Sequence, residues 1–221
     1  YYIATFSHTT GKTYIFSTDD MEKGAWTTRT FAPAYHDLSL FFDDDGRSYI
    51  VWGGGRLSIA ELKDDLSGVK EGTERVLIEN ASAPSGGGGL PAEGSQLFKK
   101  DGMYYLFNIT WPPQSMRTVV VHRARSLAGP WEGKEVLRDR GIAQGGLIDT
   151  PDGRWFAYLF RDNGSVGRIP YLAPVEWEDG WPAIGTDGRV PDTLALPAST
   201  GLMGGIVDSD DFYRKSSDPD L

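Results

Sequence analysis

Asp37, Glu93 and Gln144 occupy equivalent positions in three copies of a repeated pattern. Each lies nine residues before the glycine of an Asp-Gly pair. If the copies fold alike, the two carboxylates share one pocket, where like charges and partial burial keep one of them protonated near neutral pH. Such a pair could cleave a glycosidic bond, because the protonated group can donate to the leaving oxygen while the ionised group activates water or supports other charges. Alternatively, both are solvated residues at strand starts; their shared spacing, without charged neighbours, favours the common pocket.

The three copies are predicted hairpins, each made of an apolar strand, an Asp-Gly turn and an aromatic-rich strand. Asp-Gly favours a primed two-residue turn. The turn glycines, Gly46, Gly102 and Gly153, recur at a period of about 50 residues. A further apolar strand follows each hairpin. The hairpins span 39–52, 95–108 and 147–160, and the strands that follow them span 57–62, 118–124 and 167–172.

The beginning of the chain shows only the back half of this unit. A strand is predicted at 12–18 and a Gly-Ala-Trp closing turn at 24–26, and similar closing turns with Gly and Trp recur at 129–131 and 179–181. Several strands per unit at this period are typical of a β-propeller. An irregular β-sandwich is the alternative. The sequence therefore predicts an all-β propeller, with the rear of one blade and three complete blades in this chain, about three and a half in all.

Composition argues against several classes of protein. The 221 residues are 39% hydrophobic and 24% charged, as in an ordinary globular protein, and no apolar run approaches the roughly 18 residues of a transmembrane helix. The net charge of -9 argues against nucleic-acid and anionic-membrane partners, whereas a neutral sugar would meet no repulsion. Without cysteine, no disulfide or cysteine nucleophile can form. His8, His36 and His122 show no ligand spacing, so no histidine metal site is predicted.

Domain organisation follows the repeat. The first residues, YYIATFS, read as the middle of a strand, and we expect the chain to be a piece of a longer protein whose compartment, cytoplasmic or secreted, the sequence leaves open. Residues 82–91 are predicted to form a flexible loop. Because the repeat stops near residue 203, we expect a propeller domain over 1–202 and a linker or the start of another domain over 203–221.

Four segments together resemble glycoside hydrolase family 43, in particular its β-xylosidase and α-L-arabinofuranosidase branch. They are YHDLSLFFDDDGRSYIV, AEGSQLFKKDGMYYLF, QGGLIDTPDGRWFAYLF and VGRIPYLAPVEWEDGWP. The resemblance runs over residues 1–190 and implies a five-bladed β-propeller whose first blade is absent here. The tail GGIVDSDDFYR is similar to the start of the β-sandwich domain that often follows the propeller in this family.

The same resemblance implies an inverting hydrolase with three carboxylates. Glu93 matches the general acid, and Asp37 matches the aspartate that orients the substrate and modulates the pKa of the acid. The general base belongs to the first blade, so no residue of this chain is assigned to it and the chain alone is expected to be inactive. Arg168 matches an arginine that reaches the pocket, where its planar donors suit sugar hydroxyls or a carboxylate. Leu38 replaces a more usual proline, which leaves the expected role of Asp37 intact.

Gln144 is a second departure from the family pattern. It stands where many members carry a histidine at the propeller axis, often beside a bound water or calcium ion. Its carbonyl oxygen could still ligate calcium at the axis, although one amide is a weaker basis for such a site. No cofactor is required by the implied mechanism.

Three further side chains are candidates for binding sugar. Trp111 and Trp52 could stack on a sugar face, with packing in the core as the alternative for each. His36 adjoins Asp37 and could line the pocket, but in a regular strand alternation would point the two side chains to opposite sides. Both orientations of the His36 side chain, into the pocket and away from it, stay open.

Together these observations predict an exo-acting, inverting glycosidase. Its expected substrates are hemicellulose oligosaccharides or side chains of the plant cell wall, from which it removes terminal β-D-xylose, α-L-arabinofuranose or both. A non-catalytic propeller that binds glycans or proteins is the alternative. The sequence does not determine the oligomeric state.

Overall fold

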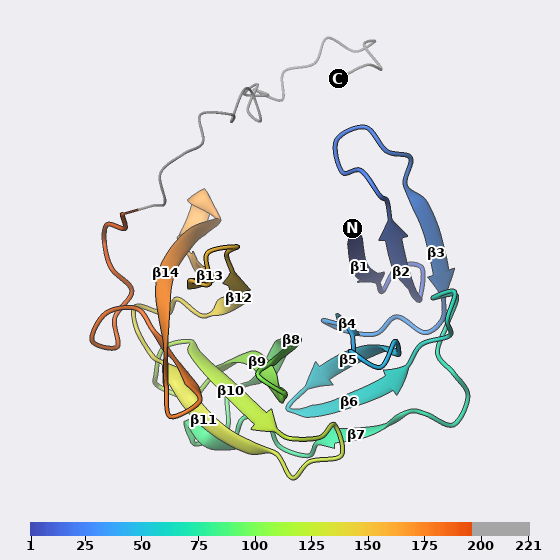
Figure 1. Ribbon diagram of the computed structural model, residues 1–221. Coiled ribbons are helices and arrows are strands. Elements are labelled where there is room, and N and C mark those ends of the chain that lie inside the picture. Colours follow the sequence, from blue (N-terminus) through green and yellow to red (C-terminus); the bar gives the residue numbers. More distant parts are fainter. Residues whose placement is uncertain (196–221) are drawn as a thin grey trace.

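The structure is a computed structural model that describes residues 1–195 and consists mainly of β-strands. Four antiparallel sheets stand around a central space like the blades of a propeller, in chain order (Figure 1). Blade 1 has three strands and blades 2 to 4 have four each. The predicted all-β propeller is therefore confirmed, whereas the count of five blades stays a prediction. The segment 203–221 lies outside the described residues, as does the end of the predicted 1–202 domain.

Each blade runs outward from the central space, so that its first strand is the innermost one. Two short 3-10 helices, η1 (Ala83–Ser85) and η2 (Gly164–Val166), lie in loops, and no helix within residues 1–195 is long and apolar enough to cross a membrane. The strands are β1 (Tyr2–Ser7), β2 (Lys12–Ser17) and β3 (Thr27–Phe31) in blade 1; β4 (Ser39–Phe42), β5 (Ser48–Gly54), β6 (Arg56–Glu61) and β7 (Arg75–Ile78) in blade 2; β8 (Leu90–Lys100), β9 (Met103–Trp111), β10 (Thr118–Ala124) and β11 (Glu132–Leu137) in blade 3; and β12 (Gln144–Asp149), β13 (Trp155–Asp162), β14 (Arg168–Glu178) and β15 (Trp181–Ile184) in blade 4.

The predicted primed two-residue turn occurs in one of the three Asp-Gly hairpins. In blade 3, Lys100 pairs with Met103, and the two residues between them, Asp101 and Gly102, have φ of 51° and 73°. Positive φ at both central residues is the mark of a type I′ turn, which matches the twist of the flanking strands.

For the other two hairpins the predicted turn is wrong, because both have three-residue loops that end in the glycine. The Gly46 N–H donates to the Asp43 carbonyl, and the Gly153 N–H donates to the Thr150 carbonyl. Among the loop residues only the two glycines have positive φ. Pro151 begins the second loop, and its ring fixes a negative φ that the primed turn cannot use.

Hydrophobic side chains fill each space between neighbouring blades. Alternation along the inner strands sends successive residues to opposite faces, so each blade contributes to the cluster on either side of it. The buried members include Ile15, Tyr35, Ile50 and Leu62 between blades 1 and 2; Phe41, Leu57, Leu97, Leu106 and Val120 between blades 2 and 3; and Phe107, Ile109, Val121, Leu147 and Leu159 between blades 3 and 4.

Hydrogen bonds from side chains also join the innermost strands of blades 2, 3 and 4. The Leu97 N–H donates to Ser39 Oγ at 3.1 Å, which links β8 to β4. Gln96 bonds to both backbone groups of Leu147: its Nε2 donates to the carbonyl at 2.8 Å, and its Oε1 accepts from the N–H at 2.7 Å. These bonds fix the three strands that surround the central space.

The predicted loop at 82–91 has more structure than the sequence suggested. Part of it is η1, and β8 already begins at Leu90. Ser82 is buried, and its Oγ accepts from the N–H of Ala92 at 2.8 Å. The four glycines that follow η1 all have positive φ. The segment therefore has a defined conformation that leads into β8.

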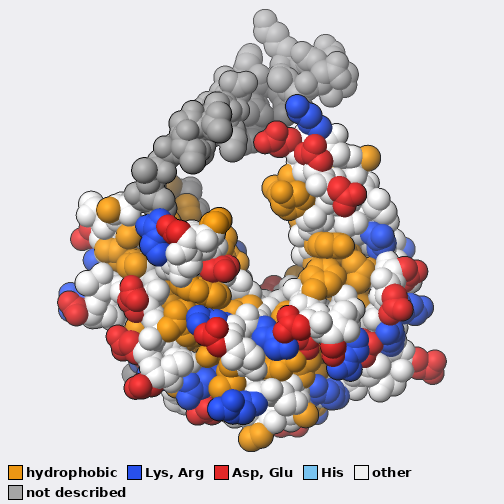
Figure 2. All heavy atoms as spheres, in the orientation of Figure 1, with side chains coloured by type: hydrophobic (Ala, Val, Ile, Leu, Met, Phe, Trp, Pro, Cys, Tyr) orange, Lys and Arg blue, Asp and Glu red, His pale blue; other side chains and the backbone are white. Residues whose placement is uncertain are grey.

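Within residues 1–195, the faces of blades 1 and 4 that flank the opening of the arc are apolar and pack against no other blade. On blade 4, Ile148, Tyr158 and Leu172 are 50%, 46% and 37% exposed, on the face opposite to the one that packs against blade 3. On blade 1, Ile3 is 53% exposed and pairs with Phe16. Hydrophobic side chains lie on both flanks of the opening (Figure 2). Exposed apolar patches commonly mark interfaces.

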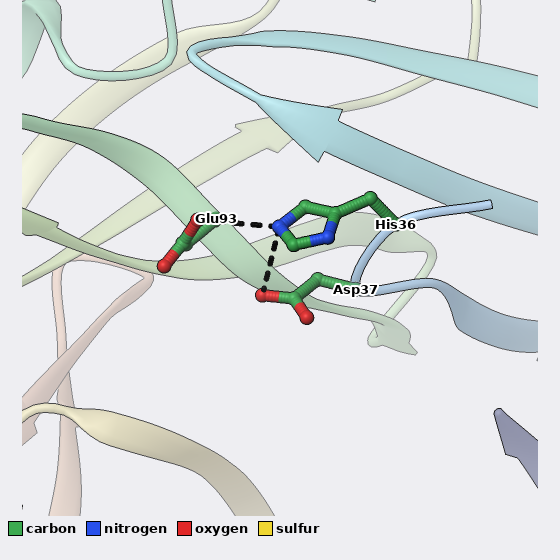
Figure 3. Close-up of side chains that lie close together, drawn as sticks. All are labelled: His36, Asp37 and Glu93. Atoms are coloured by element: carbon green, nitrogen blue, oxygen red, sulfur yellow. Dashed lines mark ion pairs between the residues drawn. The ribbon is translucent and has the colours of Figure 1, made fainter. Parts of the chain in front are cut away.

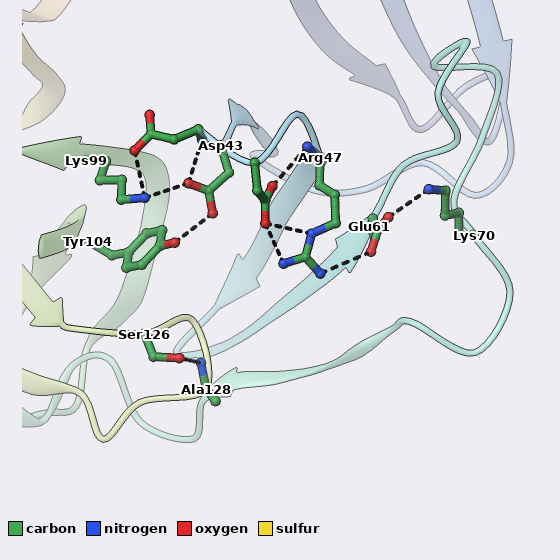
Figure 4. A network of polar contacts seen from close by, with 10 residues as sticks. Asp43, Arg47, Glu61, Lys70, Lys99, Tyr104, Ser126 and Ala128 are labelled. Atoms are coloured by element: carbon green, nitrogen blue, oxygen red, sulfur yellow. Dashed lines mark hydrogen bonds and ion pairs between the residues drawn. The ribbon is translucent and has the colours of Figure 1, made fainter. Parts of the chain in front are cut away.

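A buried carboxylate connects blades 2 and 3 at their β-hairpins (Figure 4). The Asp43 side chain is 3% exposed and accepts from Tyr104 Oη at 2.6 Å, Lys99 Nζ at 2.9 Å and the Asp44 N–H at 2.8 Å. Burial by itself raises the pKa of Asp43, but the bonds from Tyr104, Lys99 and Asp44 outweigh burial and hold that pKa below its usual range.

Asp43→Asn should lower the free energy of unfolding by about 1–3 kcal/mol, because the charged acceptor of three hydrogen bonds is lost. A depressed carboxyl pKa stabilises the fold above about pH 4, and this contribution disappears as the pH falls through the folded pKa. Urea unfolding of the whole protein at pH 7 and pH 3 should therefore show a smaller difference between variant and parent at pH 3. Asp19→Asn, at an exposed carboxylate of blade 1, is the control and should have little effect. Equal losses for both variants would contradict this role.

Candidate active site

His36, Asp37 and Glu93 lie together where blades 2 and 3 meet the central space (Figure 3). His36 Nε2 is 3.5 Å from Glu93 Oε2 and 3.8 Å from Asp37 Oδ2. One atom from each side chain lies within 4.8 Å of the other two. About half of the imidazole and about a fifth of each carboxylate are exposed, so all three groups are open to a ligand. The structure thus brings together the two carboxylates that the repeat placed at equivalent positions.

Backbone geometry at Asp37 explains why His36 joins this group. The alternation that would send the two side chains to opposite sides does not apply here, since Asp37 has φ of 49° and β4 begins only at Ser39. A left-handed residue breaks strand alternation, so neighbouring side chains can point to the same side. The imidazole of His36 also stacks on His8 at 5.7 Å and meets the edge of Phe6 at 5.2 Å. These contacts from blade 1 fix its orientation.

An irregular stretch of β8 determines the direction of the Glu93 side chain. Between Leu90 and Gln96 of β8, Glu93 is the one residue that pairs with β9, where its partner is Ile109. The pairing register shifts on both sides of Glu93. Gly94 follows with φ of 63°. Bulges of this kind reorient side chains next to functional sites. Asn108, fully buried on β9, donates to the Glu93 carbonyl at 3.3 Å and to Ser95 Oγ at 2.9 Å.

A cavity of about 310 Å³ adjoins the carboxylates at the central space. This volume lies at the low end of the range for small-molecule sites, about 300–1,000 Å³. Side chains and backbone of all four blades contribute to the wall, which is formed by Ala4, Thr5, Phe6, Asp37, Leu38, Gly94, Ser95, Gln144, Gly145 and Phe160. The pocket is therefore a product of the assembled propeller and of no single blade.

Gln144 lies in this wall, at the first residue of β12, and pairs with Phe160. Its amide is so close to Gly94 that a Cβ there would lie 3.1 Å from Gln144 Nε2. Gln144 is thus packed against the bulge that carries Glu93. Calcium at the axis stays a prediction: this ion takes six to eight oxygen ligands, whereas the wall offers one amide oxygen at this point.

The group of atoms within residues 1–195 that could share a metal ion is that of His36, Asp37 and Glu93. One imidazole nitrogen and two carboxylate oxygens suit a small ion such as Zn²⁺ better than calcium. A metal ion favours the ionised form of a carboxylate that binds it, whereas a general acid must be protonated, so metal binding by Glu93 and acid catalysis by Glu93 exclude one another.

Arg168 lies beside the pocket but pairs with a residue of its own blade. Its Nε is 3.4 Å from Asp162 Oδ1, and its guanidinium lies 4.4 Å above the ring of Phe160, which lines the cavity. Within residues 1–195 it forms no ion pair with Asp37 or Glu93. The side chain is 61% exposed, so its head group is free to meet a ligand at the rim.

The two tryptophan candidates occupy different environments. Trp52 is half-buried, lies 4.4 Å from the ring of Tyr35 and packs on the core between blades 1 and 2. Trp111 is 45% exposed at the end of β9, and its indole N–H donates to the Ser115 carbonyl at 2.8 Å. Trp111 follows Ile109, the partner of Glu93, by two residues. Trp111 therefore has the exposure and location of a stacking platform, whereas Trp52 is a core residue.

Sequence reasoning missed three residues of this site: Phe6, Asn108 and Phe160. Asn108 carried a signal, since a lone amide within the apolar run YYLFNITW must find partners when buried. For Phe6 and Phe160 no signal was available, because their positions in the wall depend on how the blades are arranged.

Known proteins are similar to this chain over most of its length. Residues 1–182 match the family model described as glycosyl hydrolases family 43. A Formosa agariphila protein named beta-xylosidase is 28% identical over 80% of the chain and 35% of its own length. The Bacteroides ovatus protein named non-reducing end alpha-L-arabinofuranosidase BoGH43B is 32% identical over 74% of the chain and 33% of its own length. The chain spans about a third of the length of these curated relatives.

A solved structure is also similar to the chain. The protein described as a bifunctional GH43-CE of Bacteroides eggerthii is 65% identical, with a TM-score of 0.90, over the whole of this chain and 29% of that one.

Asn108→Ala should destabilise the whole protein by about 1–3 kcal/mol, because the bulge at Glu93 loses both side-chain hydrogen bonds that hold it. Urea unfolding measures the loss, and a crystal structure of the variant should show a displaced Glu93 carboxylate. Asn80→Ala removes an exposed amide that accepts one bond, from the Ser82 N–H, and serves as the control. An unshifted Glu93 in Asn108→Ala would show that the bulge does not depend on this amide.

Proposed function

The chain belongs to glycosyl hydrolases family 43, and on this premise we propose that its parent protein is an inverting, exo-acting glycosidase. The proposed substrates are hemicellulose oligosaccharides or side chains that end in β-D-xylose or α-L-arabinofuranose. The observation that carries this proposal is the meeting of Asp37 and Glu93 from two blades beside the cavity. Relatives named as a β-xylosidase and an α-L-arabinofuranosidase support the choice of the two pentoses.

Glu93 is the proposed general acid, and Asp37 orients the substrate and modulates Glu93. In inverting enzymes the acid and base stand about 6.5–9.5 Å apart, because a water molecule must fit between the base and the sugar. Asp37 and Glu93 approach within 4.8 Å, which is too close for that arrangement. This short distance supports Asp37 as a partner of the acid and supports a base that lies elsewhere. Arg168, at the rim, is a proposed ligand of sugar hydroxyls.

We assign the base to a fifth blade that closes the ring in the whole protein. The uncovered apolar faces of blades 1 and 4 support this assignment, because such a blade would bury both of them. In Figure 1 the four blades form an open arc, and blades 1 and 4 stand at its two ends. A carboxylate on that blade would approach the cavity from the side opposite to blade 3.

Glu93→Gln should lower kcat of the whole protein on aryl β-xyloside or aryl α-L-arabinofuranoside by about 10²–10⁴-fold, because the leaving oxygen loses its proton donor. Proton NMR of the first anomer released should show inversion in the parent. Glu79→Gln changes an exposed glutamate paired with Arg56 and should keep full activity. A Glu93→Gln variant as active as the parent would remove Glu93 from the acid role. Retention of configuration would overturn the inverting mechanism, and no turnover by the parent would favour a binding propeller.

The 221-residue chain expressed alone should show no turnover on either substrate, because it lacks the proposed base. Its uncovered apolar faces should bind the dye ANS more strongly than the whole protein does. Full activity of the chain alone would place the base among its own carboxylates and contradict the assignment to a fifth blade.

A further inference from the structure

A buried arginine, Arg117, connects the exposed Trp111 of blade 3 to blade 4. It stands just before β10, and its side chain is 15% exposed. Its guanidinium lies 5.2 Å above the centre of the Trp111 ring. On blade 4, its Nη2 is 2.8 Å from Asp162 Oδ2. The β9–β10 hairpin of blade 3 is thus anchored to the end of β13 in the next blade (Figure 1).

The contacts of Arg117 leave its guanidinium little freedom. Its Nε and Nη1 are buried and have no hydrogen-bond acceptor among residues 1–195, so these two nitrogens are left to the aromatic face and the surrounding packing. Burying an arginine with two unpaired nitrogens is costly, and a cation on an indole face recovers part of that cost.

Two contacts hold the Trp111 side chain, and much of its surface is exposed to solvent. Arg117 contacts its ring, and the Ser115 carbonyl accepts its N–H, yet the residue remains 45% exposed. An exposed aromatic ring whose orientation is fixed from behind is suited to stack on a sugar ring, because no rotamer freedom is lost on binding.

The position of Trp111 relative to Glu93 indicates which part of a substrate it would meet. Glu93 pairs with Ile109, and Trp111 lies two residues further along β9, which corresponds to about 7 Å. Glu93 is the proposed donor to the leaving oxygen, and Trp111 is not among the residues that form the wall of the cavity beside it. Trp111 is therefore placed to meet the leaving-group sugar, beyond the scissile bond.

We propose that Arg117 is a positioning residue which, anchored by Asp162, holds Trp111 as a platform for the leaving-group sugar. This inference rests on the proposed glycosidase function and adds a determinant of substrate length to it. Lysine would serve less well at this position, because the anchor and the ring contact both use the planar guanidinium.

The experiment compares two substrates of the whole protein that share a glycone and differ in leaving group. Xylobiose has a leaving sugar that would reach Trp111, whereas β-D-xylosyl fluoride has none; if the parent cleaves only arabinofuranosides, the corresponding arabinofuranosyl pair replaces them. Arg117→Met should lower kcat/KM on the disaccharide about tenfold, mainly through KM, and leave kcat/KM on the fluoride within about twofold. Arg117→Lys should fall between Arg117→Met and the parent.

A double variant separates positioning from a general loss of structure. If Arg117 acts through Trp111, Arg117→Met should have no further effect on the disaccharide in a Trp111→Ala background. Arg56→Met, at an exposed arginine paired with Glu79, is the matched control and should match the parent on both substrates. Thermal unfolding of each variant shows whether it folds. If Arg117→Met does not fold, Arg117→Lys replaces it in these measurements.

The outcomes distinguish this inference from the function on which it rests. A parent that cleaves both substrates and an Arg117→Met variant with an unchanged KM for the disaccharide would overturn the positioning role alone. Equal losses on disaccharide and fluoride, or additive effects with Trp111→Ala, would do the same, since they indicate general damage. A parent inactive on every substrate would overturn the proposed function and this inference with it.

Discussion

The site depends on the hydrogen bonds that hold the innermost strands of blades 2, 3 and 4 at fixed positions. Gln96 bonds both backbone groups of Leu147, and Ser39 accepts from the N–H of Leu97. Because these contacts are made at the inner strands, each blade can orient its own loops while the strands that end at the central space stay in register. Apolar packing alone would not fix that register, since it has no directional component.

Irregular backbone at Asp37 and Glu93 forms the candidate site on this regular framework. Asp37 has a left-handed backbone and Glu93 stands between two bulges, so both side chains leave the alternation that their strands would impose. Asn108, buried and bonded to the bulge, stabilises the irregular stretch of β8. The frame is rigid where the blades pack and irregular where the chemistry is proposed, as expected when strain is kept at functional positions and supported by the surroundings.

Charge serves two separate purposes in this propeller. Asp43 with Lys99 and Tyr104, and Arg117 with Asp162, join neighbouring blades through ion pairs and hydrogen bonds. At the central space, His36, Asp37 and Glu93 keep part of their surface open to a ligand. The Asp43 carboxylate is fully hydrogen-bonded within the protein, whereas the three groups at the central space have capacity left for a substrate. This difference, more than the number of charges, separates structural carboxylates from candidate catalytic ones.

The sequence by itself determined the repeat, the all-β class and the pairing of Asp37 with Glu93, because strand periodicity and glycine spacing are local properties of the chain. It did not determine the turn type at Gly46 and Gly153, nor the short outer strand β11, whose sequence EGKEVL carries almost no alternation. Only the tertiary structure decided that His36 joins the carboxylates, that Trp52 packs in the core and that Phe160 lines the cavity. These positions depend on backbone conformation and on contacts between blades distant in sequence, which no local pattern encodes.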